Sequence, residues 1–229
     1  MQSLLLLHGA IGSMEQLFPL KEALSKQFEV YVFNFPGHGS NVSFEPFSIE
    51  AFAKATSDFI EKNQLYNPLV FGYSMGGYVA VYLEATCPGT FRSIVTLGTK
   101  YEWNEEVAKK ETKMLQPDLI EQKVPAFAQQ LASRHGVMEW KNVLHKTAAM
   151  LLDLGKHPLL PIASLQNITC PILILLGEKD NMVSIEETQN TATALINGYH
   201  ELLPNSMHPI EQVDVRSLAE KINVFFLNH

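Results

Sequence analysis

The 229-residue chain suits one compact domain with a substantial core and room for an inserted subdomain. Hydrophobic residues make up 46% of it and charged residues 18%, a composition that favours neither a disordered protein nor a membrane protein. The formal net charge of −7 argues against nucleic-acid binding, because that activity needs a basic surface to neutralise phosphates.

Cysteine, histidine and apolar patterns predict no cofactor and no membrane segment. Cys87 and Cys170 show no metal-ligand spacing, and each adjoins a proline at an element boundary, so we expect buried free thiols. The eight histidines form no His-x-x-x-His pair or Cys/His cluster, which predicts no metal. The apolar run at residues 4–7 is too short for a bilayer span or a signal peptide, so we expect a cytoplasmic protein without membrane association.

The first hundred residues alternate strand and helix patterns. The apolar run at residues 3–7 predicts a strand buried on both faces, which feeds the glycine-rich loop at residues 8–12. Ser13 and Gln16 form a capping-box pair, so a helix should begin there and be perturbed by Pro19. Further strands are expected near residues 28–35, 67–73 and 91–97, with helices near 48–60 and 75–87. This rhythm predicts a mostly parallel sheet with helices on both faces.

The alternation stops at residues 100–166, which are helical in character and interrupted by proline and glycine. We therefore divide the chain into a core, residues 1–99 and 167–229, and a helical insertion, residues 100–166. The insertion carries nine basic and eight acidic residues, which we assign mainly to solvated helix faces. A mild preference for anionic substrates beneath it is a lesser hypothesis.

The strand and helix rhythm resumes after the insertion. Residues 171–176 predict a fifth strand, followed by Gly177-Glu178-Lys179-Asp180. Ser184 and Glu187 form a second capping-box pair, which should open a helix to about residue 195. Residues 199–203 predict the last strand and residues 210–227 the last helix, with Ser206-Met207-His208-Pro209 between them.

One stretch points to chemistry, Gly72-Tyr73-Ser74-Met75-Gly76. It matches the Gly-x-Ser-x-Gly nucleophile elbow, in which flanking glycines let a strand and a helix approach while the serine is held in a strained turn. An apolar strand pattern precedes the motif and an apolar helix pattern follows it, as the elbow requires.

A serine nucleophile needs a base, and the base needs an acid to orient it. Asp180 and His208 both follow predicted strands, so they should lie on the same sheet edge as Ser74, in the Ser, Asp, His order tied to the elbow. Asp180 could instead cap a turn, with Glu102 as its best substitute and Asp153 a poorer one. His208 could be a packed loop histidine. The remaining histidines considered are expected to be structural, surface or packing residues: His8, His38, His135, His145 and His157.

Together these motifs resemble the α/β-hydrolase fold over nearly the whole chain. The matching residues are His8-Gly9, Pro36-Gly37-His38-Gly39, Gly72-Tyr73-Ser74-Met75-Gly76-Gly77, Gly177-Glu178-Lys179-Asp180 and His208-Pro209. The resemblance implies a six-stranded core that lacks the first two strands of the full family sheet, and it implies that the inserted helices are a lid. It also implies that Ser74 is the nucleophile, His208 the general acid/base, and Asp180 the residue that holds the imidazole tautomer.

The acyl-transfer hypothesis also needs donors for an oxyanion, which we assign to the backbone N–H groups of Ala10 and Met75. An apolar substrate pocket could be lined by residues beside the elbow and in the insertion, although core packing would explain the same residues. The candidates are Ile11, Tyr73, Trp103 and Met138.

Our leading hypothesis is a small serine esterase that cleaves an ester or thioester of a small to medium, partly apolar substrate through an acyl-enzyme. A carbon–carbon bond hydrolase or a lyase on the same scaffold is the alternative. Tyr78 weakens the lyase hypothesis, because members resembling the menaquinone-pathway lyase usually carry arginine there. A non-enzymatic small-molecule sensor is a third hypothesis. The sequence predicts neither the physiological substrate nor the oligomeric state.

Overall fold

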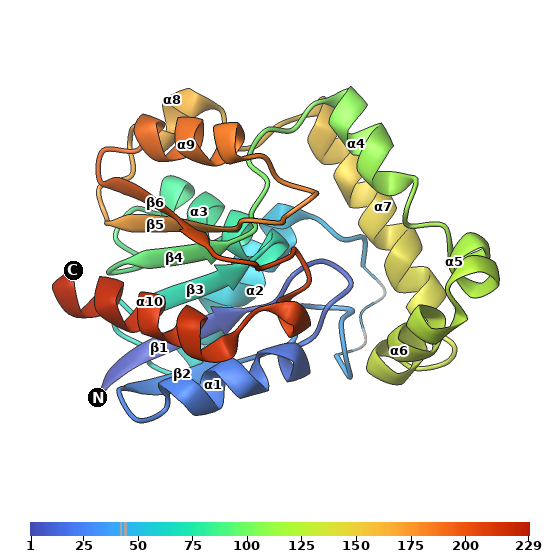
Figure 1. Ribbon diagram of the computed structural model, residues 1–229, viewed down its shortest axis with the longest axis horizontal. Helices are drawn as coiled ribbons and strands as arrows, with labels where there is room; N and C mark the ends of the chain where they lie inside the picture. Colours follow the sequence, from blue (N-terminus) through green and yellow to red (C-terminus); the bar gives the residue numbers. More distant parts are fainter. Residues whose placement is uncertain (42, 44) are drawn as a thin grey trace.

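The computed structural model describes residues 1–41, 43 and 45–229, and its centre is a parallel sheet (Figure 1). Within these residues the sheet has six strands in the order β2-β1-β3-β4-β5-β6, and every neighbouring pair is parallel. This confirms the predicted fold class. The strands are β1 (Gln2–Leu7), β2 (Phe28–Val32), β3 (Leu69–Tyr73), β4 (Ile94–Leu97), β5 (Ile172–Gly177) and β6 (Gly198–Leu203).

Two helical layers bury the two faces of the sheet, and the β1 side chains show how. Successive side chains of a strand point to opposite faces. Leu4 and Leu6 accordingly pack in one apolar cluster with α1 (Phe18–Leu24) and α10 (Val215–Asn228). Leu5 and Leu7 pack in the other cluster, with α2 (Ile49–Lys62), α3 (Met75–Thr86) and α9 (Ile185–Ala194). The uninterrupted leucine run is therefore what a strand between two helical layers requires.

Local capping signals define several helix starts. Ser48 Oγ accepts the N–H of Ala51 at 3.1 Å to begin α2, and Ser184 Oγ accepts the N–H of Glu187 at 3.0 Å to begin α9. Near the amino terminus, residues 14–17 form a short 3-10 helix, and α1 follows with Pro19 in its first turn. Pro19 therefore lies where its missing N–H costs nothing, rather than perturbing a longer helix as expected.

The segment between β4 and β5 consists of short helices. They are α4 (Glu105–Thr112), α5 (Pro117–Lys123), α6 (Pro125–His135), α7 (Trp140–Lys156) and α8 (Ile162–Leu165). Figure 1 shows α4 to α7 grouped beyond the carboxyl ends of the strands, whereas α8 lies beside α9. A small apolar cluster joins α5, α6 and α7 through Ile120, Leu131, Trp140 and Leu144. The boundaries of a separate insertion stay a prediction.

The two cysteines are free, but only Cys170 is partly buried, and Cys87 is exposed. The expectation of burial is wrong for Cys87 because it caps the carboxyl end of α3 at the surface, before Pro88-Gly89. None of the helices in the described part of the chain is long and apolar enough to cross a membrane.

Candidate active site

Ser74 lies at the junction between β3 and α3, in a backbone conformation that side chains rarely adopt, with φ 51° and ψ −116°. Such a conformation costs on the order of 1–3 kcal/mol and persists only where its surroundings hold it. Here the Ser74 N–H donates to the Leu97 carbonyl at 2.8 Å, and Thr99 Oγ1 donates to the Ser74 carbonyl at 2.9 Å. The strained turn is thus anchored by the end of the neighbouring strand β4 and the residues after it.

The glycines around Ser74 permit a very close approach of strand and helix. A Cβ atom on Gly76 would lie 2.5 Å from the Leu7 carbonyl oxygen, and one on Gly72 would lie 2.4 Å from the Gly77 Cα. Both distances are far below van der Waals contact, and both contacts are with backbone that cannot move aside. The spacing of the motif is therefore a requirement of packing at the elbow.

His208 lies in the loop after β6 and faces Ser74 from across the sheet edge. Its Nε2 is 3.3 Å from Ser74 Oγ, and its Nδ1 is 2.7 Å from Asp180 Oδ2. The His208 side chain is 10% exposed and the Asp180 side chain 1% exposed. The structure thus brings the three predicted residues into one continuous hydrogen-bonded line, although 134 positions separate Ser74 from His208.

Both oxygens of the Asp180 carboxylate accept hydrogen bonds. Oδ1 accepts the N–H groups of Met182 at 2.8 Å and Val183 at 3.0 Å, while Oδ2 accepts the N–H of His208. Burial alone would raise the pKa of Asp180, but these hydrogen bonds and the charge of His208 outweigh it, so the pKa is lowered. The other acids considered lie elsewhere: Glu102 is exposed, and the exposed Asp153 contacts His157.

The two residues whose amides are the expected oxyanion donors line the same cavity as Ser74. Ala10 follows β1, Met75 is the first residue of α3, and both line the cavity that holds Ser74 and His208. Within the described residues, neither amide donates a hydrogen bond to a protein acceptor. At Met75 this follows from helix geometry, since the first N–H groups of a helix have no partner within it. Both amides can therefore donate to a bound ligand.

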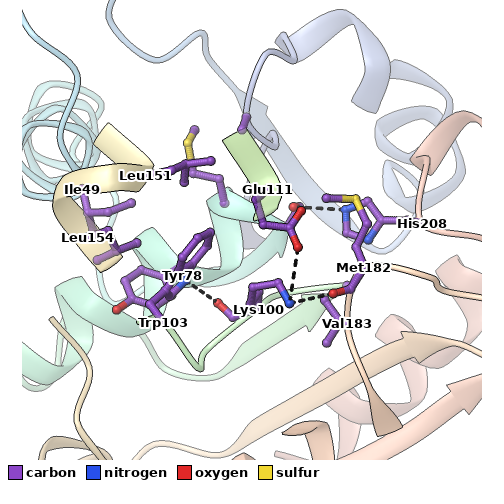
Figure 2. A pocket seen from close by; sticks show the side chains of 14 residues that line it. Ile49, Tyr78, Lys100, Trp103, Glu111, Leu151, Leu154, Met182, Val183 and His208 are labelled. Carbon is purple, nitrogen blue, oxygen red and sulfur yellow. Dashed lines mark hydrogen bonds and ion pairs between the residues drawn. The ribbon is translucent and has the colours of Figure 1, made fainter. Parts of the chain in front are cut away.

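The cavity above Ser74 has a volume of about 80 Å³ and a mainly apolar wall (Figure 2). Figure 2 shows Leu151 and Leu154 of α7 on one side and Met182 and Val183 on the other. The remaining lining residues are Ala10, Ile49, Ser74, Met75, Tyr78, Gly98, Lys100, Trp103, Glu111 and His208.

Of the four pocket residues expected from sequence, the structure brings only Trp103 to this wall. Met138 is 86% exposed, because it lies in the turn between α6 and α7. Tyr73 points to the other side of the sheet, where its hydroxyl donates to the His208 carbonyl at 3.1 Å. Ile11 packs against the cluster formed by α5, α6 and α7. Sequence reasoning missed Lys100 and Glu111; their only signal was that Lys100 lies shortly after the end of the fourth strand.

Three buried histidines lie near one another beside this site. His8 Nδ1 donates to the Gly9 carbonyl at 2.8 Å and its Nε2 accepts the N–H of Phe35 at 3.1 Å. His135 bridges in the same way, from the N–H of Gly39 at 3.0 Å to the carbonyl of Ile11 at 2.9 Å. Burial lowers the pKa of His8 to about 3.

Burial also lowers the pKa of His38, which stacks on Phe47, and of His135. Neutral histidines therefore join the loops after β1 and β2 to α6. Across the described part of the chain, no group of three or more His, Cys, Asp or Glu side chains is arranged to hold a metal ion.

Parts of the chain are similar in sequence to proteins named as esterases. A Mycoplasma genitalium protein named as an esterase/lipase is 31% identical over 109 residues, which make up 45% of this chain and 40% of that protein. A pimeloyl-[acyl-carrier protein] methyl ester esterase of Neisseria meningitidis is 34% identical over 90 residues, 39% of this chain and 33% of that protein. The chain thus matches less than half the length of either relative.

A solved structure covers much more of the chain. The thermophilic esterase of Thermogutta terrifontis superposes with a TM-score of 0.80 at 20% sequence identity, covering 100% of this chain and 90% of that one. At this identity the likeness shows the fold alone. The model of the alpha/beta hydrolase fold family matches residues 2–152, well over half of the chain. This protein is therefore a member of the α/β-hydrolase fold family.

Proposed function

We propose that this protein is a serine hydrolase that cleaves a carboxylic ester or thioester of a small, partly apolar substrate. The observation that carries the proposal is the line from Ser74 Oγ through the His208 imidazole to Asp180 Oδ2, at 3.3 Å and 2.7 Å, on the wall of an apolar cavity. The esterase names of relatives that match part of the chain support the same reaction class.

In the proposed reaction His208 Nε2 takes the proton of Ser74 Oγ as this oxygen attacks the substrate carbonyl carbon. The same imidazole then protonates the leaving alcohol or thiol. Water, deprotonated by His208, releases the acyl group from Ser74. Asp180 keeps the proton on Nδ1, so that Nε2 faces the serine as a base, and it stabilises the imidazolium that forms.

The amides of Ala10 and Met75 are the proposed donors to the oxyanion. Removing one such donor costs about 2.7–4 kcal/mol of transition-state stabilisation in enzymes of this kind. Helices α4 and α7 supply Glu111, Leu151 and Leu154 to the cavity wall, so we assign the helices of residues 100–166 to a lid that covers the cavity and limits the access of bulk solvent.

The volume of the cavity supports a short acyl group. An apolar cavity of about 150 Å³ holds a benzene molecule. The volume here is about 80 Å³, which favours short acyl chains over long ones. Tyr78 lines the cavity as a neutral side chain, and burial raises its pKa further, to about 12. Hydrolysis therefore has more support here than the elimination chemistry of lyases that carry arginine at this position.

The test is hydrolysis of p-nitrophenyl acetate, butanoate and octanoate by wild type, Ser74→Ala and the control Ser57→Ala. Ser57 is an exposed serine on α2 and does not line the cavity. We expect butanoate to be preferred to octanoate, and Ser74→Ala to lower kcat/KM on the order of 10⁴-fold or more. Ser57→Ala should match wild type, and a fluorophosphonate should label wild type but not Ser74→Ala.

Equal turnover by wild type and Ser74→Ala would contradict the proposal. Absence of fluorophosphonate labelling, combined with cleavage of a carbon–carbon bond in a diketone, would favour the alternative reaction class.

A further inference from the structure

The cavity contains one charged feature away from the Ser74 and His208 pair. Lys100 follows β4 and Glu111 lies on α4, and their charged ends meet at the cavity wall (Figure 2). Lys100 Nζ is 3.8 Å from Glu111 Oε1 and 3.8 Å from Glu187 Oε2. The side chains of Lys100 and Glu111 are only 15% and 12% exposed. Charges so far removed from water need specific partners.

Two members of this group have close partners. Lys100 Nζ donates to the Met182 carbonyl at 2.6 Å. Glu187 Oε1 accepts the N–H groups of Tyr101 at 2.6 Å and Glu102 at 2.9 Å. Their charges are therefore held by hydrogen bonds within the protein.

Glu111 differs from them. Its contact with Lys100 is longer than a hydrogen bond, and among the described residues its carboxylate accepts no hydrogen bond. The Glu111 carboxylate oxygens are also not fully enclosed by protein atoms. Because Glu111 also lines the cavity, these oxygens can accept a hydrogen bond from a ligand there.

The balance of charge limits what that ligand can be. One ammonium group faces two carboxylates, and burial raises the pKa of Glu187, so the group formed by Lys100, Glu111 and Glu187 has no net positive charge. The Glu111 carboxylate at the cavity wall disfavours a substrate carboxylate beside it, whereas a hydroxyl or ammonium group can donate to Glu111. This charge balance is the opposite of the anion preference considered from the composition of the insertion.

We propose that Glu111 is a specificity residue that accepts a hydrogen bond from a hydroxyl or ammonium group on the substrate. The inference rests on the proposed function of the same site. The preferred substrate is then a short ester or thioester with an apolar body that carries one such donor, on either its acyl or its alcohol side. The apolar wall binds the apolar body of the substrate, and Glu111 accepts the hydrogen bond from its hydroxyl or ammonium group.

Binding to the Ser74→Ala protein tests this without turnover. Four esters are titrated into the ¹⁵N-labelled protein, and each Kd is measured by NMR: ethyl butanoate, ethyl 3-hydroxybutanoate, 2-hydroxyethyl butanoate and monoethyl succinate. We expect at least one hydroxylated ester to bind about 10-fold or more tightly than ethyl butanoate, the effect of one hydrogen bond to a charged group. Monoethyl succinate should bind most weakly.

The same titrations are repeated with Glu111→Leu or Glu105→Leu added to Ser74→Ala. They test whether Glu111 causes the difference in Kd between the hydroxylated esters and ethyl butanoate. Glu105 begins α4 but is exposed and pairs with Lys109. The hydroxyl advantage should disappear with Glu111→Leu and persist with Glu105→Leu. Lys100 keeps its contacts with Met182 and Glu187 in the first variant, so the site should still fold.

The inference is overturned if ethyl butanoate binds as well as both hydroxylated esters, if monoethyl succinate binds best, if no ester binds, or if the advantage survives Glu111→Leu. Failure of the proposed function has a separate signature. In that case wild type would leave all four esters intact, whatever their Kd values in the Ser74→Ala protein.

Discussion

The hydrogen bonds around Asp180 determine its ionisation state. Its two oxygens accept three hydrogen bonds, from the amides of Met182 and Val183 and from the imidazole of His208. Together with the charge of His208 these lower its pKa despite burial, so the carboxylate stays ionised at neutral pH. A permanently ionised partner is what the proposed role requires, since it keeps the proton of His208 on Nδ1.

Asp180→Asn tests this role at the residue scale. The amide of asparagine can present its NH₂ group to His208, which favours the tautomer that carries its proton on Nε2 and cannot act as a base towards Ser74. We expect kcat/KM for p-nitrophenyl butanoate to fall on the order of 10⁴-fold. Glu102→Gln is the matched control, because Glu102 is the alternative acid and is exposed. A large loss with Glu102→Gln and little with Asp180→Asn would reverse the assignment.

At the scale of elements, the loop between β4 and α4 carries Lys100 and Trp103 to the cavity. Helix α9 holds this loop through Glu187, which was expected to complete a capping box with Ser184. In the structure the Ser184 hydroxyl accepts the N–H of Glu187, as a capping box requires, but the Glu187 side chain does not return to the Ser184 backbone. The Glu187 carboxylate instead accepts the amides of Tyr101 and Glu102. One buried side chain thus connects a helix to the loop that shapes the site.

Glu187→Ala should therefore destabilise the protein, because it leaves two amides and the Lys100 ammonium without their carboxylate. We expect the free energy of unfolding to fall by about 2–4 kcal/mol, measured by urea denaturation. Glu187→Gln, which keeps an acceptor for the amides, should lose less. Glu186→Ala removes an exposed carboxylate from the same first turn and should change stability by no more than about 0.5 kcal/mol. Equal effects at positions 186 and 187 would refute this role.

At the scale of the whole molecule, the buried histidines make stability depend on pH. His8 and His135 each accept one backbone N–H and donate to one carbonyl, an arrangement that only the neutral imidazole can make. Burial lowers the pKa of His8 to about 3 and also lowers those of His38 and His135. Between the lowered values and the unfolded value of 6.5, the unfolded chain binds more protons than the folded one.

The contribution of these histidines to stability is therefore fully present above about pH 6.5 and is lost as the pH falls towards 3. For His8 alone the loss is about 1.4 kcal/mol per pH unit, or about 2 kcal/mol at pH 5. Urea denaturation at pH 7, 6 and 5 measures this slope. His8→Asn should reduce the slope, while His145→Asn, at an exposed position on α7, should leave it unchanged. A slope that His8→Asn does not alter would contradict this account.

The sequence alone predicted the structural features that depend on residues close together in the chain. The alternating burial of Leu4 to Leu7 and the glycines around Ser74 are local patterns, and each has one structural solution that the fold confirms. Ser48 and Ser184 likewise cap the helices that their patterns predicted. The order of strands and helices followed from these signals, because hydrophobic periodicity and capping act over a few residues.

Tertiary structure decided everything that depends on segments meeting across the molecule. It placed Asp180 rather than Glu102 beside His208, left Met138 in solvent, and exposed Cys87. The pairing of Lys100 with Glu111 had no sequence signal beyond the position of Lys100 shortly after the fourth strand, because it depends on where α4 lies relative to the loop after β4. Local periodicity determines which face of an element is apolar, but only the packing of distant elements determines which polar side chains share one cavity.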